Sequence, residues 1–409
     1  MADRIKVSVI LTSFNHAKYL KEAIDSALNQ TFSDFELIIW DDASTDESWQ
    51  IITSYLDPRI KPFRNEVQKK GVWGLNKAIS EIAIGEYIAI HHSDDIWELQ
   101  KLEKQVAFLD AHPEIGAVFS NAVIITENGK LLENSTNIYY KIFEQPNRTR
   151  HDWLNYFFCR GNALCHPSLL IRKTCYAEHE PYRSGFGLLA DLDAWVRLCL
   201  KHDIFIFPEK LVRYRVRAQR MNASTDPKTR IRRPFEFLQV LDNYKKIATP
   251  EELIKVFPSA EKYIKPEGCD VAFALGMIAL ELKPYKVTEL FGLSLIFEAL
   301  NDPDRARIIK DVYGFTSKDF VPMIAQHDIF STELLADQAA QIQELSLRLE
   351  EIASSKAWKF VTVLRKLREF LFPPNSKREK FTQLFSKPFL NYTRKKGQKS
   401  EDSIVAKSD

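Results

Sequence analysis

Cysteine is scarce in this chain of 409 residues, and its pattern indicates neither a disulfide framework nor a zinc site. The five cysteines show no CxxC pair and no regular spacing. Because disulfide-rich domains and zinc sites depend on such spacing, we expect reduced thiols in a cytosolic compartment. The start of the chain also lacks the charged and apolar regions of a signal peptide, so secretion is not expected.

Long apolar runs and glycine-rich loops are missing as well. The longest nearly uncharged apolar run, Val271 to Leu280, is far shorter than the roughly 20 residues of a membrane-spanning helix. We expect this run to form a buried helix. No glycine-rich phosphate loop occurs, which disfavours a nucleotidyltransferase or another nucleotide enzyme that depends on such a loop.

Charge is balanced overall but unevenly distributed. The chain has 57 basic and 55 acidic residues, a net charge of +2. Between Lys356 and Lys399, thirteen basic residues face two acidic ones, so this segment carries a net charge of +11. Bulky apolar residues such as Trp358 and Leu364 are interleaved with the basic ones. Residues 357–409 are therefore predicted to form a basic amphipathic tail on an anionic membrane surface. The alternative is a helix docked on its own protein with a disordered tail, and nucleic acid is not expected as a partner.

Alternating strand and helix patterns predict an α/β fold for the first part of the chain. Residues 5–126 alternate short β-rich runs, such as FELIIW and EYIAIHH, with amphipathic helical patterns. Such alternation is typical of βαβ units in a parallel sheet. We assign residues 1–225 to this domain. Strand patterns nearly vanish after it, and residues 226–330 are predicted to be a helical domain.

A short heptad pattern follows the predicted helical domain. Leu335, Ile342 and Leu349 share one heptad position, which predicts a coiled-coil-like helix over residues 331–356 that forms a homo- or hetero-oligomer. The pattern covers fewer than three full heptads, so a solvated amphipathic helix remains the alternative.

Two pairs of acidic residues follow two of the predicted strands. Asp41 and Asp42 end FELIIWDD, and Asp94 and Asp95 follow EYIAIHHS. In open α/β sheets, ligands bind beyond the carboxyl ends of the strands. There, one carboxylate can accept hydrogen bonds from a base or ribose while another binds Mg²⁺ or Mn²⁺. The alternative for the first pair is helix capping, because Ser44 begins an S-x-x-E capping box.

Four segments in order along the chain are typical of one enzyme family. They are VSVILTSFN at a strand end, the acidic turn FELIIWDDASTD, the helix GVWGLNKAI and the acidic loop IAIHHSDDIWELQ. Together they resemble the inverting family 2 glycosyltransferases, which have the Rossmann-like GT-A fold and use nucleoside diphosphate sugars. The resemblance covers residues 5–125 strongly and residues 160–217 more loosely.

The resemblance implies a donor site with a metal. Asp94 would be the main ligand of Mn²⁺ or Mg²⁺, with His92 and Asp95 as further candidates. The ion would neutralise the diphosphate as its bond to the sugar breaks. Because His91 and His92 are neighbours on a strand, only His92 is expected to face the site. The implied donor-binding residues are Thr12, Phe14, Asn15, Asp41, Asp42, Asn76, His92, Ser93 and Arg217.

The later segment LLADLDAWVRL resembles the family's E-D-x-D-x-W-x-R-L segment, in which a carboxylate is the catalytic base. Asp191 takes that position, and an inverting transfer needs one base to remove the proton of the acceptor hydroxyl. His166, Asp193 and Trp195 are predicted on the acceptor side. The alternatives are a buried hydrogen-bonded histidine for His166 and a core aromatic for Trp195.

Three departures from the family motifs concern charge. His92 replaces the first acid of D-x-D, Ala190 replaces the glutamate before Asp191, and Arg217 stands where histidine is expected. Arg217, with Arg213 and Arg215, could bind the diphosphate bidentately and partly replace the charge of a metal.

The leading hypothesis is an enzyme that transfers one sugar, with inversion, to a saccharide or lipid-linked saccharide. We expect it to act peripherally at the inner face of the cytoplasmic membrane, in bacterial surface polysaccharide assembly. The second hypothesis is a non-catalytic, transferase-like protein that organises partners through residues 331–409. Retention of Asp94 and Asp191 favours the enzyme, and the sequence leaves the sugar, nucleotide and acceptor open.

Overall fold

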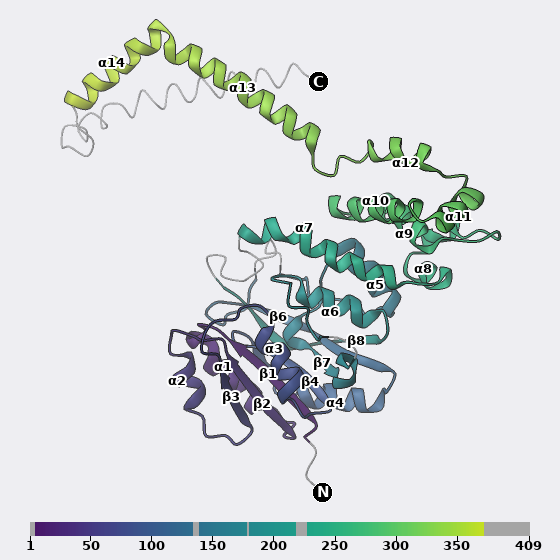
Figure 1. Ribbon diagram of the computed structural model, residues 1–409. Helices are drawn as coiled ribbons and strands as arrows, with labels where there is room; N and C mark the ends of the chain where they lie inside the picture. Colours follow the sequence, from purple (N-terminus) through teal and green to yellow (C-terminus); the bar gives the residue numbers. More distant parts are fainter. Residues whose placement is uncertain (1–4, 134–138, 178–179, 218–226, 372–409) are drawn as a thin grey trace. The chain divides into compact units, whose positions relative to one another are not determined.

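One mixed sheet contains the eight strands found in the described residues, which are 5–133, 139–177, 180–217 and 227–371 of the computed structural model (Figure 1). The strands are β1 (Val7–Ser13), β2 (Phe35–Asp41), β3 (Ile60–Arg64), β4 (Tyr87–His92), β5 (Ile96–Trp97), β6 (Ile115–Thr126), β7 (Leu170–Arg172) and β8 (Asp203–Val216). Their order in the sheet is β3-β2-β1-β4-β7-β6-β8-β5. The first four of these run parallel, whereas β7 runs antiparallel to both of its neighbours. The predicted α/β class is confirmed.

The three central strands bring the predicted motifs to one edge of the sheet. Strands β1, β2 and β4 are apolar and almost entirely buried, as expected for a parallel sheet covered on both faces. Ser13 lies beside Asp41 at the end of β2, and Thr12 lies beside His92 at the end of β4. The loops that follow these strands therefore begin side by side.

Helices cover both faces of the sheet. On one face, α1 (Ala17–Leu28), α2 (Ser48–Thr53) and α4 (Lys101–Ala111) pack against β1 residues such as Val9 and Leu11. On the other face, α3 (Trp73–Lys77), η1 (Ala78–Ile82), α5 (Arg150–Arg160) and α6 (Ala190–Cys199) pack against Ile10 and its neighbours. The alternation of side chains along β1 separates the two cores. The 3₁₀ helices η2 (His166–Ser168) and η3 (Lys173–Tyr176) flank β7.

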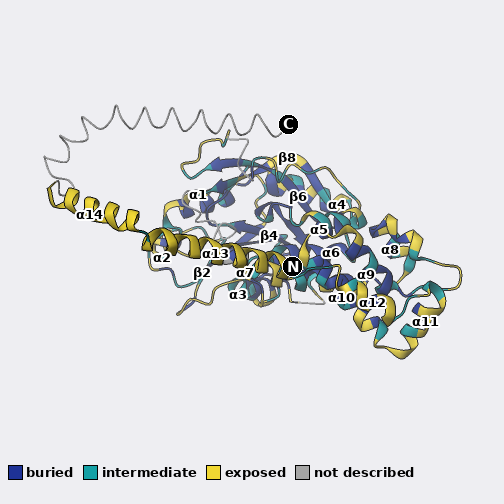
Figure 2. Cartoon of the chain, turned by 90° about the horizontal axis from the view of Figure 1, so that it is seen from above, coloured by how far each residue is buried: buried dark blue, intermediate teal, exposed yellow. Residues whose placement is uncertain are grey.

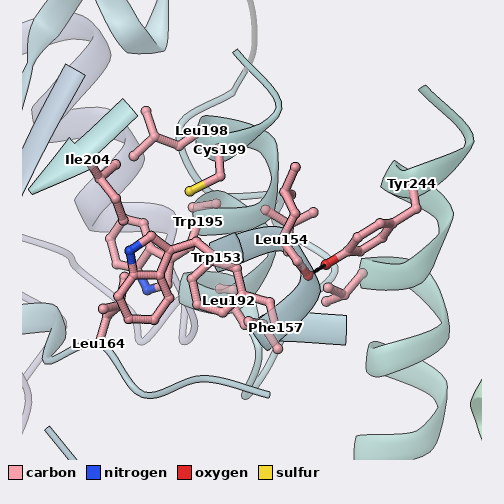
Figure 3. Close-up of a cluster of buried hydrophobic side chains, with 14 of the residues drawn as sticks. Trp153, Leu154, Phe157, Leu164, Leu192, Trp195, Leu198, Cys199, Ile204 and Tyr244 are labelled. Carbon is pink, nitrogen blue, oxygen red and sulfur yellow. Dashed lines mark hydrogen bonds between the residues drawn. The ribbon is translucent and has the colours of Figure 1, made fainter. Parts of the chain in front are cut away.

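The helical segment after the sheet shares the core of α5 and α6. Its helices are α7 (Pro227–Leu241), η6 (Asp242–Lys246), α8 (Pro250–Val256), η7 (Pro258–Tyr263), α9 (Val271–Leu282), α10 (Lys286–Leu300), α11 (Pro303–Tyr313) and α12 (Ser317–Ile324). Leu241 and Tyr244 are buried in the same cluster as Trp153, and the Tyr244 hydroxyl donates to the Leu154 carbonyl at 2.7 Å (Figure 3). The boundary drawn at 225/226 thus marks a change of secondary structure and not a break between two cores, since residues Met1–Ile329 form one compact unit.

The apolar run predicted to be a buried helix is α9, and this prediction is confirmed. Its side chains Phe273, Leu275 and Ile278 are buried, and the helix packs against α10. Among the described residues, no helix combines the length and apolarity that crossing a bilayer needs.

The second compact unit, Phe330–Asp409, is described as far as residue 371. It contains α13 (Thr332–Ser354) and α14 (Lys356–Leu371), and neither helix has a buried residue (Figure 2). Helices therefore form where the heptad pattern and the basic amphipathic pattern predict them. The part of the predicted tail from residue 372 onward lies outside the described residues.

Candidate active site

Asp41 ends β2 in a fully buried position. Its Oδ2 accepts the backbone N–H of Ser44 at 3.0 Å and lies 3.2 Å from Nε of Arg64. Its Oδ1 is buried without a hydrogen-bond partner among the described residues, and so is Oγ of the neighbouring Ser13. Burying a polar atom without a hydrogen-bond partner is costly. Two such atoms at neighbouring strand ends therefore favour a site where a polar ligand supplies the missing partners.

Asp42 organises the loop that follows β3. Its carboxylate accepts Nδ2 of Asn65 at 2.6 Å and the backbone N–H groups of Lys69 and Lys70 at 2.8 and 2.9 Å. These contacts close the 65–70 loop over the end of β2. Asp42 therefore fixes the loop after β3 next to the end of β2.

The loop after β1 is fixed by the turn after β2. Asn15 has a positive φ of 52°, its backbone N–H donates to Oγ of Ser44 at 2.9 Å, and its Oδ1 accepts the N–H of Thr45 at 2.8 Å. Helix α2 begins only at Ser48, so the capping box predicted at Ser44 does not form. Ser44 instead accepts the backbone N–H of Asn15 and so fixes the loop after β1. Phe14 is 37% exposed beside it.

Asp94 and Asp95 are both buried but have different partners. Oδ1 of Asp95 accepts the backbone N–H of Arg215 at 2.7 Å, and the Arg215 guanidinium donates to the Asp94 carbonyl at 2.7 Å. Arg215 is itself buried and contacts Glu22 at 2.6 Å. It therefore fixes the acidic loop and does not line an open diphosphate site. Arg213, two residues before Arg215 on β8, pairs with Glu98 at the surface.

A chain of polar side chains runs inward from Asp95. Nδ1 of His92 lies 3.3 Å from Oδ2 of Asp95, Nε2 of His92 lies 3.3 Å from Nδ1 of His166, and Nε2 of His166 lies 2.8 Å from the Tyr182 hydroxyl. Burial lowers the pKa of His92, but Asp95, Asp94 and Asp191 outweigh this and raise it. Burial also raises the pKa of Asp95 to about 6.

His91 points to the opposite face of the sheet, as strand alternation predicts. Its ring stacks on Trp97 at 4.2 Å between centroids, and its Nε2 lies 3.0 Å from the carbonyl of Ala23. Burial lowers its pKa to about 3, so His91 is a neutral core residue. Only His92 belongs to the site.

Donor atoms of His92, Asp94 and Asp95 lie within 4.8 Å of one another, close enough to hold a metal ion. Imidazole nitrogen and carboxylate oxygen both suit Mn²⁺, and oxygen suits Mg²⁺. By atom type and spacing alone, these donor atoms resemble a site for a divalent cation. Asp94 is already paired, however, because Nε of Arg217 lies 3.2 Å from its Oδ2.

Arg217 is held from two sides. Besides Asp94, its Nη1 lies 2.7 Å from Nε2 of His16, whose Nδ1 lies 2.7 Å from Oγ of Ser93. Burial lowers the pKa of His16, which favours the neutral ring that accepts the guanidinium N–H. His16 therefore connects the loop after β1 to the acidic loop after β4.

Asp191 lies in the first turn of α6, where a carboxylate is favoured by the helix dipole. Nδ2 of Asn162 donates to its Oδ2 at 2.7 Å, and the backbone N–H of Leu192 donates to its Oδ1 at 2.7 Å. Burial raises the pKa of Asp191 to about 6, although these hydrogen bonds and His92 oppose the rise. Asp191 is thus close enough to His92 for the two groups to influence each other.

Three residues predicted at the site have structural roles instead. Asp193 is fully buried and binds Arg183 and Arg197, and Nδ2 of Asn243 donates to it at 2.9 Å. Trp195 is buried in the same hydrophobic cluster as Leu164 and Leu192 (Figure 3). Asp193 is therefore a structural residue, and Trp195 is the core aromatic that was given as its alternative, because other segments cover α6 at both positions.

Asn76 is the third such residue. Its amide donates to the Tyr182 carbonyl at 2.6 Å and to Glu180 at 2.8 Å, and its Oδ1 accepts the Tyr182 N–H at 3.0 Å. This set of contacts holds the 180–182 segment against α3. The predicted donor contact is replaced by a contact within the protein, since the amide is already satisfied.

Comparison with known proteins shows which family the chain belongs to. The sequence profile of Glycosyl transferase family 2 matches residues 8–172. An uncharacterized glycosyltransferase of Methanocaldococcus jannaschii is 32% identical over 220 residues, which are 52% of this chain and 72% of that protein. The O-antigen biosynthesis glycosyltransferase WbnJ of Escherichia coli is 30% identical over 197 residues, 47% of this chain and 71% of that protein. The chain belongs to glycosyl transferase family 2.

A third relative is matched over a shorter part of its length. The UDP-Glc:alpha-D-GlcNAc-diphosphoundecaprenol beta-1,3-glucosyltransferase WfaP of Escherichia coli is 38% identical over 104 residues, which are 25% of this chain and 41% of that protein. The glycosyltransferase domain described here, an α/β sheet domain followed by a helical region, agrees with the predicted GT-A architecture.

Several contacts of this glycosyltransferase domain were not predicted. His16 directly follows Asn15, the last residue of the first motif. This position next to predicted donor residues could have identified His16 as a candidate site residue. Asn162 and Tyr182 carry no motif of their own. They reach Asp191 and His166 only because the chain between α5 and α6 folds back over the sheet, which local patterns do not reveal.

Proposed function

We propose that this protein transfers one sugar from a nucleoside diphosphate sugar to a hydroxyl group of a saccharide or lipid-linked saccharide, with inversion at the anomeric carbon. One observation supports the proposal: Asp41 and His92 lie at the same edge of the sheet, and Asp94 and Asp191 are close enough to His92 to raise its pKa. The name of WfaP, a glucosyltransferase acting on a lipid diphosphate-linked sugar, supports a lipid-linked acceptor.

Donor binding is assigned to the ends of β1 and β2. The buried Oδ1 of Asp41 and Oγ of Ser13, which lack partners among the described residues, would bind N–H or O–H groups of the base or ribose. The exposed ring of Phe14 would contact the base. Thr12 would also approach the base, and Ser93 would be a further donor-binding residue.

Asp191 is proposed to be the catalytic base. It would remove the proton of the acceptor hydroxyl while that oxygen attacks the anomeric carbon, and the bond from this carbon to the diphosphate would break with its electron pair leaving on the phosphate oxygen. A carboxyl group with a pKa of about 6 is charged at pH 7 and is a better base than an ordinary aspartate. The hydrogen bond from Asn162 would keep the carboxylate oriented.

Two sources of positive charge are available for the diphosphate. The sequence predicts Mn²⁺ or Mg²⁺ on Asp94, and the nearby donor atoms of His92 and Asp95 fit such an ion. A bound cation would stabilise the departing diphosphate. Arg217 is the other source, since its guanidinium already lies against Asp94.

Activity measurements with a matched control variant test the proposal. The protein is incubated with UDP-, dTDP- and GDP-sugars and Mn²⁺, with saccharide and lipid-linked acceptors, and release of the nucleoside diphosphate is followed. Asp191→Asn should lower turnover by at least about 10²-fold, the scale of a lost general base, with nucleotide affinity unchanged. Asp304→Asn removes a surface carboxylate that is 85% exposed and should leave turnover unchanged. Nucleotide binding without turnover on any acceptor, and with no effect of Asp191→Asn, would favour the non-catalytic scaffold.

We further propose that residues 357–409 bind an anionic membrane at the inner face of the cytoplasmic membrane. In α14, Phe360, Leu364 and Leu367 share one exposed face, and Lys359 and Lys366 lie on a flank of that face. This arrangement suits a helix in the plane of a bilayer surface. The exposed heptad residues of α13 are proposed to form an oligomer.

Vesicle sedimentation tests the membrane proposal. The full chain should sediment with vesicles containing anionic lipid, and a chain truncated at Ala353 should not. Charge attraction should make the binding weaker at high salt. Equal sedimentation of both chains would contradict the proposal.

A further inference from the structure

Arg217 lies beside the carboxylate of Asp94, the predicted ligand of a divalent cation. Its Nε is 3.2 Å from Oδ2 of Asp94, and its Nη1 is 2.7 Å from Nε2 of His16. The side chain is only 14% exposed, so it is packed into the site and does not extend into solvent. A metal ion on Asp94 would lie next to this guanidinium, and the like charges of the two would oppose its binding.

The remaining members of the cluster offer little negative charge to a cation. Asp95 receives the backbone N–H of Arg215 on one oxygen and faces His92 at 3.3 Å on the other. The Arg215 guanidinium binds the Asp94 carbonyl. Divalent cations prefer several anionic oxygen ligands, but here the Asp94 carboxylate already faces the Arg217 guanidinium, and the Asp95 carboxylate faces a backbone N–H and His92.

The contact with His16 orients the guanidinium. His16 precedes α1 and is itself held by Ser93, so the planar group is fixed between the loops that follow β1 and β4. A guanidinium presents five N–H donors in a plane and binds phosphate oxygens bidentately. Through His16, Arg217 is connected to the predicted donor residue Ser93, and this position suits such a contact.

We infer that Arg217 supplies the positive charge for the donor diphosphate, and that nucleotide binding therefore requires no divalent cation. This inference rests on the proposed function. Arg217 donates hydrogen bonds to the diphosphate oxygens and stabilises the charge that develops there as the sugar departs. Asp94 and His16 act as positioning residues that hold the guanidinium.

Calorimetric titration tests the inference without an activity assay. The wild-type protein is titrated with UDP, GDP and dTDP, once in EDTA and once in Mn²⁺, and with Mn²⁺ alone. The affinity for the nucleotide that binds should agree within about twofold between the two buffers, and Mn²⁺ alone should bind weakly. A loss of about tenfold or more in EDTA, restored by Mn²⁺, overturns the inference.

Variants of Arg217 provide the second part of the test. Arg217→Ala should weaken nucleotide binding in EDTA by about tenfold or more. Arg217→Lys keeps the charge but loses the planar guanidinium, so its nucleotide affinity should lie between those of the wild type and Arg217→Ala. Arg217→His should gain Mn²⁺ binding, because the guanidinium no longer occupies Asp94. Lys210→Ala is the control, since Lys210 lies on β8, the strand that ends just before Arg217, and pairs with Glu144 at the surface.

The outcomes separate this inference from the proposed function. If no nucleoside diphosphate binds in either buffer, the proposed function itself fails. If nucleotide binds equally in both buffers but Arg217→Ala binds as tightly as Lys210→Ala, Arg217 is not the source of charge. If a variant fails to fold, the wild-type comparison of EDTA with Mn²⁺ still decides whether a cation is required.

Discussion

Replacing Asp193 by asparagine should destabilise the protein and leave substrate binding intact. The Asp193 carboxylate is fully buried and joins three segments: it accepts Nε of Arg183 at 3.0 Å, Nε of Arg197 at 2.9 Å and Nδ2 of Asn243 at 2.9 Å. The substitution keeps the shape but removes the charge. It leaves Arg197, whose side chain is only 10% exposed, without its counter-ion.

The expected loss follows from the burial of the partners. Removing one member of a buried ion pair costs about 3–5 kcal/mol, because the other charge stays buried and uncompensated. Arg183 is 38% exposed and can regain water, so we expect the lower end, about 3 kcal/mol. Charge-assisted hydrogen bonds of about 1.5–3 kcal/mol each agree with this figure.

Urea unfolding followed by tryptophan fluorescence measures the effect. Asp193→Asn should lower the midpoint of unfolding with an unchanged slope, whereas the control Asp304→Asn at the surface should change the free energy of unfolding by less than about 0.5 kcal/mol. A loss below about 1 kcal/mol for Asp193→Asn, together with a raised KM for the acceptor, would refute the structural role and restore the acceptor-side prediction.

Three further predictions concern the base and the core. Turnover should rise tenfold per pH unit up to about pH 6 and then level off as Asp191, with its raised pKa of about 6, becomes the charged base; a flat profile between pH 5 and 8 would exclude this role. Burial places the pKa of Lys101 well below its usual value, so above the lowered pKa the unfolded chain binds more protons than the folded one. The free energy of unfolding should therefore rise from pH 7 to 10 in the wild type. Urea unfolding should show a smaller rise in Lys101→Met. Gly85→Ala would bring a Cβ within 2.4 Å of the Ser8 backbone nitrogen, and thermal unfolding should reveal a loss of about 2 kcal/mol or more.

The fold class and the donor edge could be predicted because they depend on local patterns. Apolar runs of strand length predicted β1, β2 and β4, and the parallel register then brings Asp41 and His92 to the same edge. Alternation along β4 was sufficient to separate His91 from His92. These features follow from the period of a strand and the geometry of a parallel sheet.

The roles of Asp193, Trp195 and Asn76 could not be predicted in this way. A motif states which residue types recur but not which face of a helix another segment covers. Asp193 is enclosed because Arg183 and η6 pack over α6, and both partners are distant in sequence. Asn76 is likewise occupied by the backbone of Tyr182.

The sequence by itself determined the family, the α/β class and the carboxylates at the strand ends, because these depend on composition, periodicity and motif order. Only the tertiary structure decided how the charges are paired. His16 and Arg217 are 201 positions apart, yet they meet beside Asp94. Whether a carboxylate is open to a metal or already neutralised depends on such distant contacts, and a linear pattern does not contain them.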